Sequence, residues 1–275
     1  TITFANRNSI RRSVLTRLDD GSLDYKIEDI KNSIVLLKTT SNIDGRNLNN
    51  IKQLVKDVHN QEGIVLLDAS QSFDHNIDIL KDADFDAAFG SSHKMYGPSL
   101  GFIIIKKTLL KDLNCFFIGG STVQDVQLDS YELIENDNEI YSRIEPGLQN
   151  FAGIVGLNEA IKWKTSFSQE KLDAVEYERN LQRYLNTGLK GIKSIKLLSE
   201  EPSSVVSIYS EKMDSHRMGI FLSQRNIMCR TGYHCCHYYL KNLKKYPPLF
   251  RISLGLHNTT EQIDYLIESV NILLR

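Results

Sequence analysis

From residue 24 onward, short apolar runs alternate with segments in which apolar residues recur at helical spacing. Runs of this length are typical of buried strands, and residues 48–59, between the first two runs, show the spacing of an amphipathic helix. Strands separated by helices predict βαβ units and a mostly parallel central sheet, so we expect an α/β fold. The predicted strands are 34–37, 64–67, 85–89 and 102–105.

The second half of the chain has a different pattern of predicted helices and strands. Helical spacing at about 151–163 and 169–189 is followed by a smaller set of strands and helices, which predicts a second layered α+β domain. We place the boundary near residue 165, with a large domain at 1–165 and a small C-terminal domain at 166–275. The elements predicted for the small domain are strands 205–209 and 250–254 and helices 217–225 and 260–274.

Charge and hydropathy exclude several classes of protein. Lysine plus arginine (33) nearly balances aspartate plus glutamate (34), so no global field favours nucleic acid or an anionic membrane. No run approaches the roughly 18 apolar residues of a spanning helix, and residues 1–12 lack a signal-peptide pattern. The four cysteines do not form the spaced framework of small secreted domains. We therefore expect a cytoplasmic protein with free thiols that binds neither nucleic acid nor membrane.

An acidic residue, Asp68, ends the second apolar run and is followed by Gln71. In open α/β sheets, ligands gather beyond the carboxyl ends of the strands. A carboxylate at this place can pair with a protonated pyridine nitrogen and keep an aromatic cofactor ring electron-poor. The alternative role for Asp68 is to cap the helix that follows.

A lysine, Lys94, lies between two predicted strands in the stretch SSHKMYGP at residues 91–98. Burying an ammonium group is costly, whereas a covalent imine to a cofactor aldehyde removes the charge and makes the amine chemically useful. Ser91 and His93 can bind a phosphate beside it. The alternative is an ordinary lysine of a surface loop.

The stretch CRTGYHCC at residues 229–236 contains three of the four cysteines. A cysteine in a loop near Arg230 and His234 has the cationic surroundings that favour a thiolate nucleophile, although a lone cysteine is more often an inert small apolar residue. Zinc is disfavoured, because adjacent residues cannot all face one ion and the usual ligand spacing is absent. We predict no metal site.

An arginine, Arg251, lies near the start of the predicted strand 250–254. Its planar guanidinium can bind a carboxylate through two hydrogen bonds. The alternative is an ordinary arginine of an edge strand.

Taken together, these blocks resemble the class V aminotransferase-like enzymes, which are pyridoxal-5'-phosphate (PLP) enzymes of fold type I, and within them the cysteine desulfurases and selenocysteine lyases. The resemblance extends from about residue 19 to the C-terminus, with the blocks in the family's order. The matching blocks are DASQ at 68–71, SSHKMYGP at 91–98, GGS at 119–121, EPG at 145–147, RTGYHC at 230–235 and RIS at 251–253.

The resemblance implies a role for each matching residue. Lys94 would hold PLP and move the proton, and Cys235 would be the nucleophile that takes sulfur. Arg251 would bind the substrate carboxylate with Arg230 nearby, while Asn42 would lie near the cofactor hydroxyl and that carboxylate. Three further contacts to PLP would come from the remaining matches, which are Asp68 to the pyridine nitrogen, Gln71 to the ring hydroxyl, and Ser91 with His93 to the phosphate.

A cysteine desulfurase is therefore the predicted function. The enzyme would release alanine from L-cysteine and keep the sulfur as a persulfide on Cys235, and an acceptor protein would collect it, for example in iron–sulfur cluster assembly. The resemblance also implies a homodimer. The alternatives are another enzyme of the class, namely an aminotransferase or a selenocysteine lyase, and a catalytically inactive relative that serves as a scaffold.

Several positions depart from the family pattern. The family has a Gly-Thr-Thr phosphate loop and a histidine stacked on PLP before the part seen here, and residues 1–30 contain neither, so the N-terminal part of the large domain is expected to be incomplete. Leu148 replaces a threonine that often reaches the partner subunit's phosphate. Tyr233 and Cys236 replace commoner residues, which leaves Cys236 as a competing nucleophile or a relay partner for Cys235.

Overall fold

The structure is a computed structural model that describes residues 2–115, 117–134, 140–169 and 171–275. The chain forms two compact units. Unit 1 consists of Thr1–Thr39 and Leu48–Ile161, and unit 2 consists of Thr40–Asn47 and Lys162–Arg275. The division near residue 161 lies close to the boundary expected at 165, but the membership of residues 40–47 in unit 2 was not predicted.

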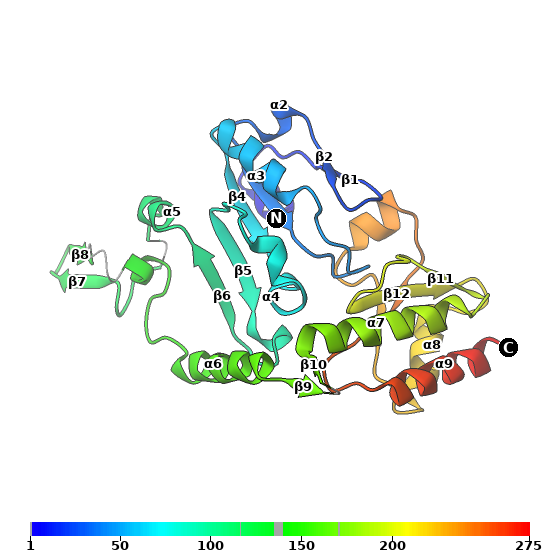
Figure 1. Cartoon of the computed structure of the whole chain (residues 1–275). Coiled ribbons are helices and arrows are strands. Elements are labelled where there is room, and N and C mark those ends of the chain that lie inside the picture. Colours follow the sequence, from blue (N-terminus) through cyan, green and yellow to red (C-terminus); the bar gives the residue numbers. More distant parts are fainter. Residues whose placement is uncertain (1, 116, 135–139, 170) are drawn as a thin grey trace. The chain divides into compact units, whose positions relative to one another are not determined.

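Unit 1 is an α/β unit, as predicted (Figure 1). Its strands are β1 (Thr16–Arg17), β2 (Leu23–Asp24), β3 (Ile34–Lys38), β4 (Ile64–Asp68), β5 (Ala87–Ser91), β6 (Gly101–Ile105), β7 (Val123–Val126) and β8 (Tyr131–Leu133). Its helices are α1 (Ile2–Arg7), α2 (Ile27–Ile30), α3 (Ile51–Asn60), α4 (Ser72–His75), α5 (Lys107–Asp112) and α6 (Phe151–Thr165), the last residues of which belong to unit 2. Short 3₁₀ turns are η1 (Ile77–Leu80), η2 (Ser92–Lys94) and η3 (Ile140–Arg143).

The central sheet of unit 1 has the strand order β3-β4-β5-β6. β3, β4 and β5 are parallel, and β6 is antiparallel to β5. The prediction of a mostly parallel sheet is thus confirmed, with an antiparallel edge strand of the kind common in α/β folds. The third predicted strand, 85–89, differs in its bounds, since β5 spans Ala87–Ser91.

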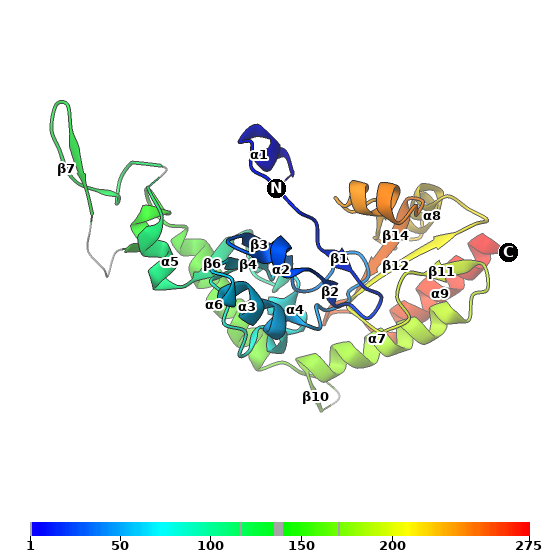
Figure 2. The ribbon, with the colours of Figure 1, turned by 90° about the horizontal axis from the view of Figure 1, so that it is seen from above.

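One face of this sheet is covered by α3. The buried residues of α3 recur at i, i+3, i+4 and i+7, which places them on a single face of the helix. This face packs on the inward side chains of β3 and β4, and Figure 2 shows α3 and α4 on the same side of these strands. The residues of this core include Leu54, Val55, Val58, Val35, Leu37, Val65 and Leu67.

The opposite face of the sheet is apolar and largely exposed. Ile34 and Leu36 of β3 are 66% and 52% exposed, and Phe89 of β5 is 42% exposed. These residues alternate with the buried ones because successive side chains of a strand point to opposite faces. Figure 2 shows α1 standing apart from the strands.

This alternation predicts unequal effects for two neighbouring leucines. Leu37→Ala should lower the free energy of unfolding of unit 1 by about 2–5 kcal/mol, because Leu37 is 3% exposed in the core. Leu36→Ala, one residue away on the exposed face, should cost well under half as much. Urea unfolding of both variants measures the difference, and equal losses would contradict the assigned faces.

Unit 2 is an α+β unit. Its strands are β9 (Ser168–Gln169), β10 (Leu172–Asp173), β11 (Ile195–Leu197), β12 (Val205–Ser210), β13 (Arg230–Gly232) and β14 (Leu249–Ser253). Its helices are α7 (Ala174–Lys190), α8 (Ser215–Ser223), the π-helix η4 (Tyr238–Leu243) and α9 (Thr260–Leu274). The main sheet is antiparallel, with the order β11-β12-β14-β13.

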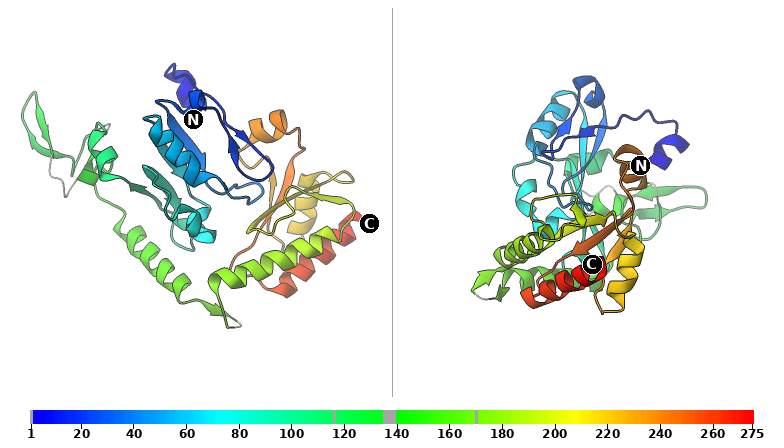
Figure 3. Two further views of the ribbon diagram at one scale, coloured as in Figure 1. Left: turned by 45° about the horizontal axis from the view of Figure 1, so that its top comes forward. Right: turned by 90° about the vertical axis from the view of Figure 1, so that its right-hand side faces the viewer.

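Two long helices support this sheet. α7 and α9 contact one another, and in the left view of Figure 3 they run side by side. Asp173 caps α7 by accepting a hydrogen bond from the Glu176 backbone N–H, so the helix begins at Ala174 rather than at the predicted residue 169. A capping box between Thr259 and Gln262 starts α9 at Thr260, as predicted.

Residues 40–47 are fixed to unit 2 by close contacts. Gly45 has φ +68°, and a Cβ at this position would overlap the Ser203 side chain. The Ser207 hydroxyl donates a hydrogen bond to the Ile43 carbonyl, and Ile43 is buried against Leu240 and Leu249. A glycine is therefore required where this segment turns across the unit 2 sheet.

The helices of the described residues include none with both the length and the apolar character needed to cross a lipid bilayer.

Candidate active site

Polar residues gather where the parallel strands of unit 1 end. Asp68 is the last residue of β4, and its register partner on β3 is Lys38. The Lys38 ammonium lies 3.1 Å from Asp68 Oδ2. Asp68 Oδ1 also accepts a hydrogen bond from the Ser70 backbone N–H at 3.2 Å. Helix α4 instead has Gln71 at its N-cap position, so capping of α4 is not the role of Asp68.

These contacts determine the charge of Asp68. Burial raises its pKa, but the hydrogen bonds from Ser70 and the ammonium of Lys38 outweigh burial and hold the pKa of Asp68 below its usual value. The carboxyl group is therefore ionised at neutral pH, as a partner for a protonated ring nitrogen must be.

Lys94 ends the 3₁₀ turn η2, which follows β5 directly. The turn is closed by hydrogen bonds from the backbone N–H groups of Met95 and Gly97 to the Ser92 carbonyl. A Cβ at Gly97 would lie 2.2 Å from Ser92 Oγ, so only glycine permits this close approach. Since β4 and β5 are parallel neighbours, Asp68 at the end of β4 and Lys94 after the end of β5 lie at the same carboxyl-terminal side of the sheet.

Three further predicted residues lie at the carboxyl-terminal side of these strands. Ser91 Oγ is 2.9 Å from His93 Nδ1, which makes a paired hydroxyl and imidazole beside Lys94. Gln71 precedes α4, three residues after Asp68. Hydroxyl, imidazole and amide donors of this kind are suited to phosphate and phenolic oxygens.

A second group of predicted residues surrounds the cysteines of unit 2. The chain was expected to form a loop at Arg230, but Arg230–Gly232 instead pairs with β14 as the short strand β13. The turn follows it: His234 and Cys235 have φ +47° and +63°, and the Cys236 N–H donates to the Tyr233 carbonyl at 2.7 Å. Two consecutive left-handed residues without glycine cost roughly 1–3 kcal/mol each. The result is a tight turn that leaves Cys235 exposed.

Arg230 lies beside this thiol. Its Nη2 is 4.0 Å from Cys235 Sγ, within the range of a hydrogen bond to sulfur. A guanidinium at this distance stabilises negative charge on Sγ. Cys229 differs, since burial raises the pKa of its thiol to about 11 and keeps it protonated.

Asn42 connects the cysteine turn to β14. Its Nδ2 donates to the His234 carbonyl at 3.1 Å, and its Oδ1 lies 3.8 Å from Cys236 Sγ. Its own carbonyl accepts a hydrogen bond from Arg251 Nη1 at 3.0 Å. β14 lies between β12 and β13, so Arg251 belongs to an internal strand and not to an edge.

Arg251 retains a free donor. Its Nε is buried and has no hydrogen-bond partner among the described residues. The pKa of Arg251 is lowered mainly by burial, and the nearby charge of Arg230 lowers it further. A buried guanidinium with an unused N–H attracts a carboxylate.

His234 is 4% exposed, and neither ring nitrogen has a partner among the described residues. Burial lowers the pKa of His234 from 6.5 to about 4, and the charges of Arg251 and Arg230 act in the same direction. The imidazole is therefore neutral at neutral pH and does not add to the positive charge around Cys235.

This neutral histidine predicts a loss of stability in mild acid. The unfolded chain binds a proton at His234 as the pH falls through 6.5, while the folded chain does so only near 4. The free energy of unfolding should thus fall between these values, by an amount on the order of 1–3 kcal/mol. Urea unfolding across this pH window should show a smaller fall for His234→Gln, whereas the exposed His257→Gln should behave as the unsubstituted chain.

The structure thus assembles the predicted residues in two groups. Unit 1 gathers Asp68, Gln71, Ser91, His93 and Lys94, and unit 2 gathers Asn42, Arg230, Cys235 and Arg251. Sequence reasoning missed Lys38, although its position at the end of the neighbouring apolar run was a usable signal. It also missed that Asn42 forms hydrogen bonds to both His234 and Arg251, which are far from it in the sequence.

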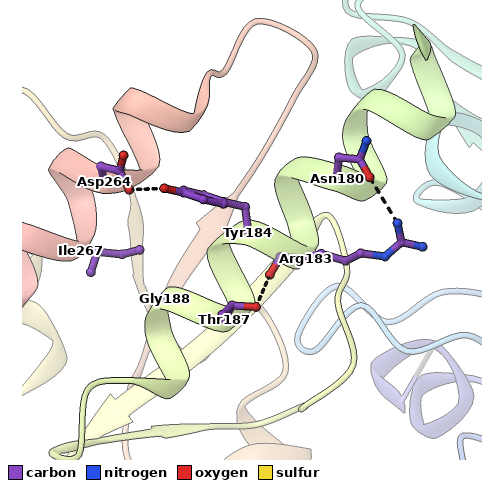
Figure 4. Close-up of a pocket in the computed structure, with 7 residues that line it drawn as sticks. All are labelled: Asn180, Arg183, Tyr184, Thr187, Gly188, Asp264 and Ile267. Atoms are coloured by element: carbon purple, nitrogen blue, oxygen red, sulfur yellow. Dashed lines mark hydrogen bonds between the residues drawn. The ribbon is translucent and has the colours of Figure 1, made fainter. Parts of the chain in front are cut away.

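A cavity elsewhere in unit 2 contains none of these residues. It has a volume of about 520 Å³ and lies between α7 and α9 (Figure 4). Tyr184 Oη donates to Asp264 Oδ1 at 2.7 Å, and Arg183 Nη1 donates to Asn180 Oδ1 at 3.2 Å. Its polar groups therefore satisfy one another, and its two helices serve to support the sheet that carries Arg251.

The family model for class-V aminotransferases matches residues 8–266. The chain therefore belongs to the class-V aminotransferase family, and its fold is that of the PLP-dependent transferases of fold type I. Members of this family depend on PLP.

Curated relatives are cysteine desulfurases. The cysteine desulfurase of Wigglesworthia glossinidia brevipalpis is 33% identical over 272 residues, which cover 96% of this chain and 64% of the relative. A probable cysteine desulfurase of Haemophilus influenzae is 31% identical over 252 residues, covering 90% of this chain and 55% of the relative. The chain thus spans about 55–64% of the length of these two relatives.

Solved structures show the same fold. The apo cysteine desulfurase from Thermococcus onnurineus NA1 has a TM-score of 0.84 at 24% identity, covering 99% of this chain and 68% of that chain. A cysteine desulfurase from Escherichia coli has a TM-score of 0.79 at 24% identity, covering 88% and 60%.

Proposed function

We propose that this protein is a PLP-dependent cysteine desulfurase that moves sulfur from L-cysteine to Cys235. The observation that carries the proposal is the exposed Cys235 on a strained turn, with the Arg230 guanidinium 4.0 Å from its Sγ. Transamination has no use for a thiol held in this way. The similarity to curated cysteine desulfurases supports the same activity.

The residues of unit 1 fit the cofactor. Asp68 is ionised and suited to a protonated pyridine nitrogen, Gln71 to the ring hydroxyl, and the Ser91–His93 pair to phosphate oxygens. Lys94 supplies the amine that attaches the cofactor. When bound, PLP supplies an electron sink for the charge that develops at the substrate Cα.

The chain's own residues perform the remaining steps. Arg251 binds the substrate carboxylate through its unused Nε–H, with Asn42 fixing the orientation of the guanidinium. The Lys94 amine would move the proton of the substrate Cα. Cys235 Sγ attacks the substrate sulfur, so a bond between two sulfurs forms while the carbon–sulfur bond breaks. Alanine leaves, and a persulfide remains on Cys235.

One mass measurement tests this proposal. After borohydride reduction in the presence of PLP, a cofactor adduct should map to Lys94, and after treatment with cysteine a single added sulfur should map to Cys235. Alanine release without added sulfur would favour another reaction of the class. Absence of both the adduct and alanine would favour an inactive scaffold.

We further propose that the sulfur passes to an acceptor protein, in support of iron–sulfur cluster assembly, and that the protein acts in the cytoplasm. The four free cysteines suit a reducing compartment.

We also propose a homodimer through α6. In unit 1 this helix buries only Gly153 and Ala160, while its apolar residues Phe151, Ile154 and Val155 are 60%, 49% and 62% exposed. Several exposed apolar side chains close together on one helix are normally covered by a partner. A second copy of the chain would cover it.

If α6 forms the dimer interface, a charged residue introduced into it should disrupt the dimer. Val155→Glu should convert the dimer into a monomer, because a carboxylate at the buried centre of an interface costs several kcal/mol. Light scattering at matched concentration measures the molar mass. Ile220→Glu on α8, where the side chain is 63% exposed, should leave the dimer intact. A mass of 31.4 kDa for the unsubstituted protein would contradict the proposal.

A further inference from the structure

The charge of this chain is unevenly distributed. Residues 215–260 contain seven lysines and arginines and no aspartate or glutamate. The other 26 of the 33 basic residues, and all 34 acidic residues, lie outside this segment. A nearly neutral chain thus carries a purely basic segment, and this segment includes Cys235.

Three of these basic residues lie on η4 or directly after it, and η4 is the helix that follows the cysteine turn (orange in Figure 1). The Leu240 N–H donates to the Cys236 carbonyl at 2.9 Å, so the helix is continuous with the turn. Leu240 is fully buried and anchors one side of the helix in the core of unit 2. Lys241 within η4, and Lys244 and Lys245 directly after it, are exposed.

Nothing in the described part of the chain neutralises these lysines. None of the three forms an ion pair with a described carboxylate, and Lys244 lies 6.0 Å from the Tyr239 ring as a cation–π contact. Two exposed apolar residues accompany them, since Tyr238 is 54% and Leu243 52% exposed. These five residues, Tyr238, Lys241, Leu243, Lys244 and Lys245, form what we call the basic η4 surface.

We propose that the basic η4 surface docks an acidic polypeptide that presents a thiol, and so brings the sulfur acceptor to Cys235. Exposed positive charge without a carboxylate partner complements an acidic polypeptide and accelerates its association. The inference rests on the proposed sulfur transfer and names the chemistry of its acceptor.

The transfer itself balances without another reagent. The acceptor thiolate bonds to the outer sulfur of the Cys235 persulfide, and the bond from that sulfur to Cys235 Sγ breaks. The electron pair stays on Sγ, where Arg230 stabilises the thiolate. The acceptor is oxidised to a persulfide, and Cys235 is reduced.

Thiol–disulfide exchange tests the docking without any desulfurase activity. The probes are a cysteine peptide flanked by glutamates and the same peptide with glutamines, each as the mixed disulfide with thionitrobenzoate. Attack by Cys235 releases coloured thionitrobenzoate, and the Cys235→Ser variant gives the background rate. At low ionic strength the glutamate peptide should react roughly tenfold faster or more, and high salt should remove the advantage.

Charge reversal on the basic η4 surface should abolish this preference. The triple variant Lys241→Glu, Lys244→Glu, Lys245→Glu should react with both peptides at similar rates while keeping its rate with the glutamine peptide.

The matched control changes the same net charge elsewhere in unit 2. The variant Lys171→Glu, Lys193→Glu, Lys196→Glu, at three exposed positions, should keep the preference for the glutamate peptide. Equal rates for both peptides in the unsubstituted protein, or a preference lost equally in both triple variants, would overturn the proposal.

Two further arms separate the alternatives. In the first arm, either a duplex oligonucleotide or a cysteine-free glutamate peptide is added, and the rate at which Cys235 reacts with the glutamine peptide is measured. If the oligonucleotide lowers this rate and the glutamate peptide does not, the proposal is overturned and the surface is assigned to nucleic acid.

In the PLP-loaded enzyme, turnover of cysteine with dithiothreitol tests the desulfurase activity alone. Failure of that turnover counts against the proposed function, whereas the exchange rates decide the docking independently.

Discussion

Replacing Lys94 by alanine should abolish both the reducible cofactor adduct and the release of alanine from cysteine. The Lys94 amine is the only group proposed both to attach PLP and to move the Cα proton. Loss of a positioned general base alone costs about 10²–10⁴-fold in rate, and loss of the attachment adds to this. Mass spectrometry of the borohydride-treated protein and an alanine assay measure the two effects together.

A lysine outside the site provides the control. Lys81→Ala, at an exposed position of unit 1, should retain both the adduct and the activity. An adduct that persists on the Lys94→Ala variant at another lysine, with alanine still produced, would place the chemistry elsewhere.

Replacing Cys235 by serine should separate cofactor binding from sulfur transfer. The variant should keep the borohydride-reducible adduct on Lys94, because Cys235 makes no proposed contact with the cofactor. Persulfide formation and alanine release should fall on the order of a thousandfold or more, as for other covalent nucleophiles. Single-turnover alanine release and a persulfide-specific label measure these losses.

Cys236→Ser is the matched variant, since it removes the neighbouring thiol and leaves the turn unchanged in length. Cys236 is half-buried and lies against Asn42 Oδ1, whereas Cys235 is exposed beside Arg230. We therefore expect Cys236→Ser to retain most of the activity. A complete loss with Cys236→Ser and retention with Cys235→Ser would reverse the assignment of the nucleophile.

The sheet of unit 1 was predictable because local sequence carries its signal. Each buried strand is a short apolar run, and α3 repeats apolar residues along one face, so both elements follow from patterns within a dozen residues. The start of α9 was predicted correctly because its capping residue, Thr259, was recognised in the sequence. The start of α7 was misplaced because its capping residue, Asp173, was not recognised.

The candidate site residues were proposed from the sequence, whereas their contacts could not be predicted from it. Asp68, Lys94 and Cys235 were identified from their motifs and from the resemblance to a family. The Lys38–Asp68 pair depends on strand register, and the bracing by Asn42 depends on tertiary contacts between segments far apart in sequence. Neither leaves a periodic trace in the sequence.

The exposed apolar face of the unit 1 sheet has a consequence for the protein in solution. The exposed isoleucine, leucine and phenylalanine side chains of this sheet face can bind fluorescent hydrophobic dyes and other apolar surfaces. The colloidal behaviour of this polypeptide will therefore depend on what shields Ile34, Leu36 and Phe89 from water.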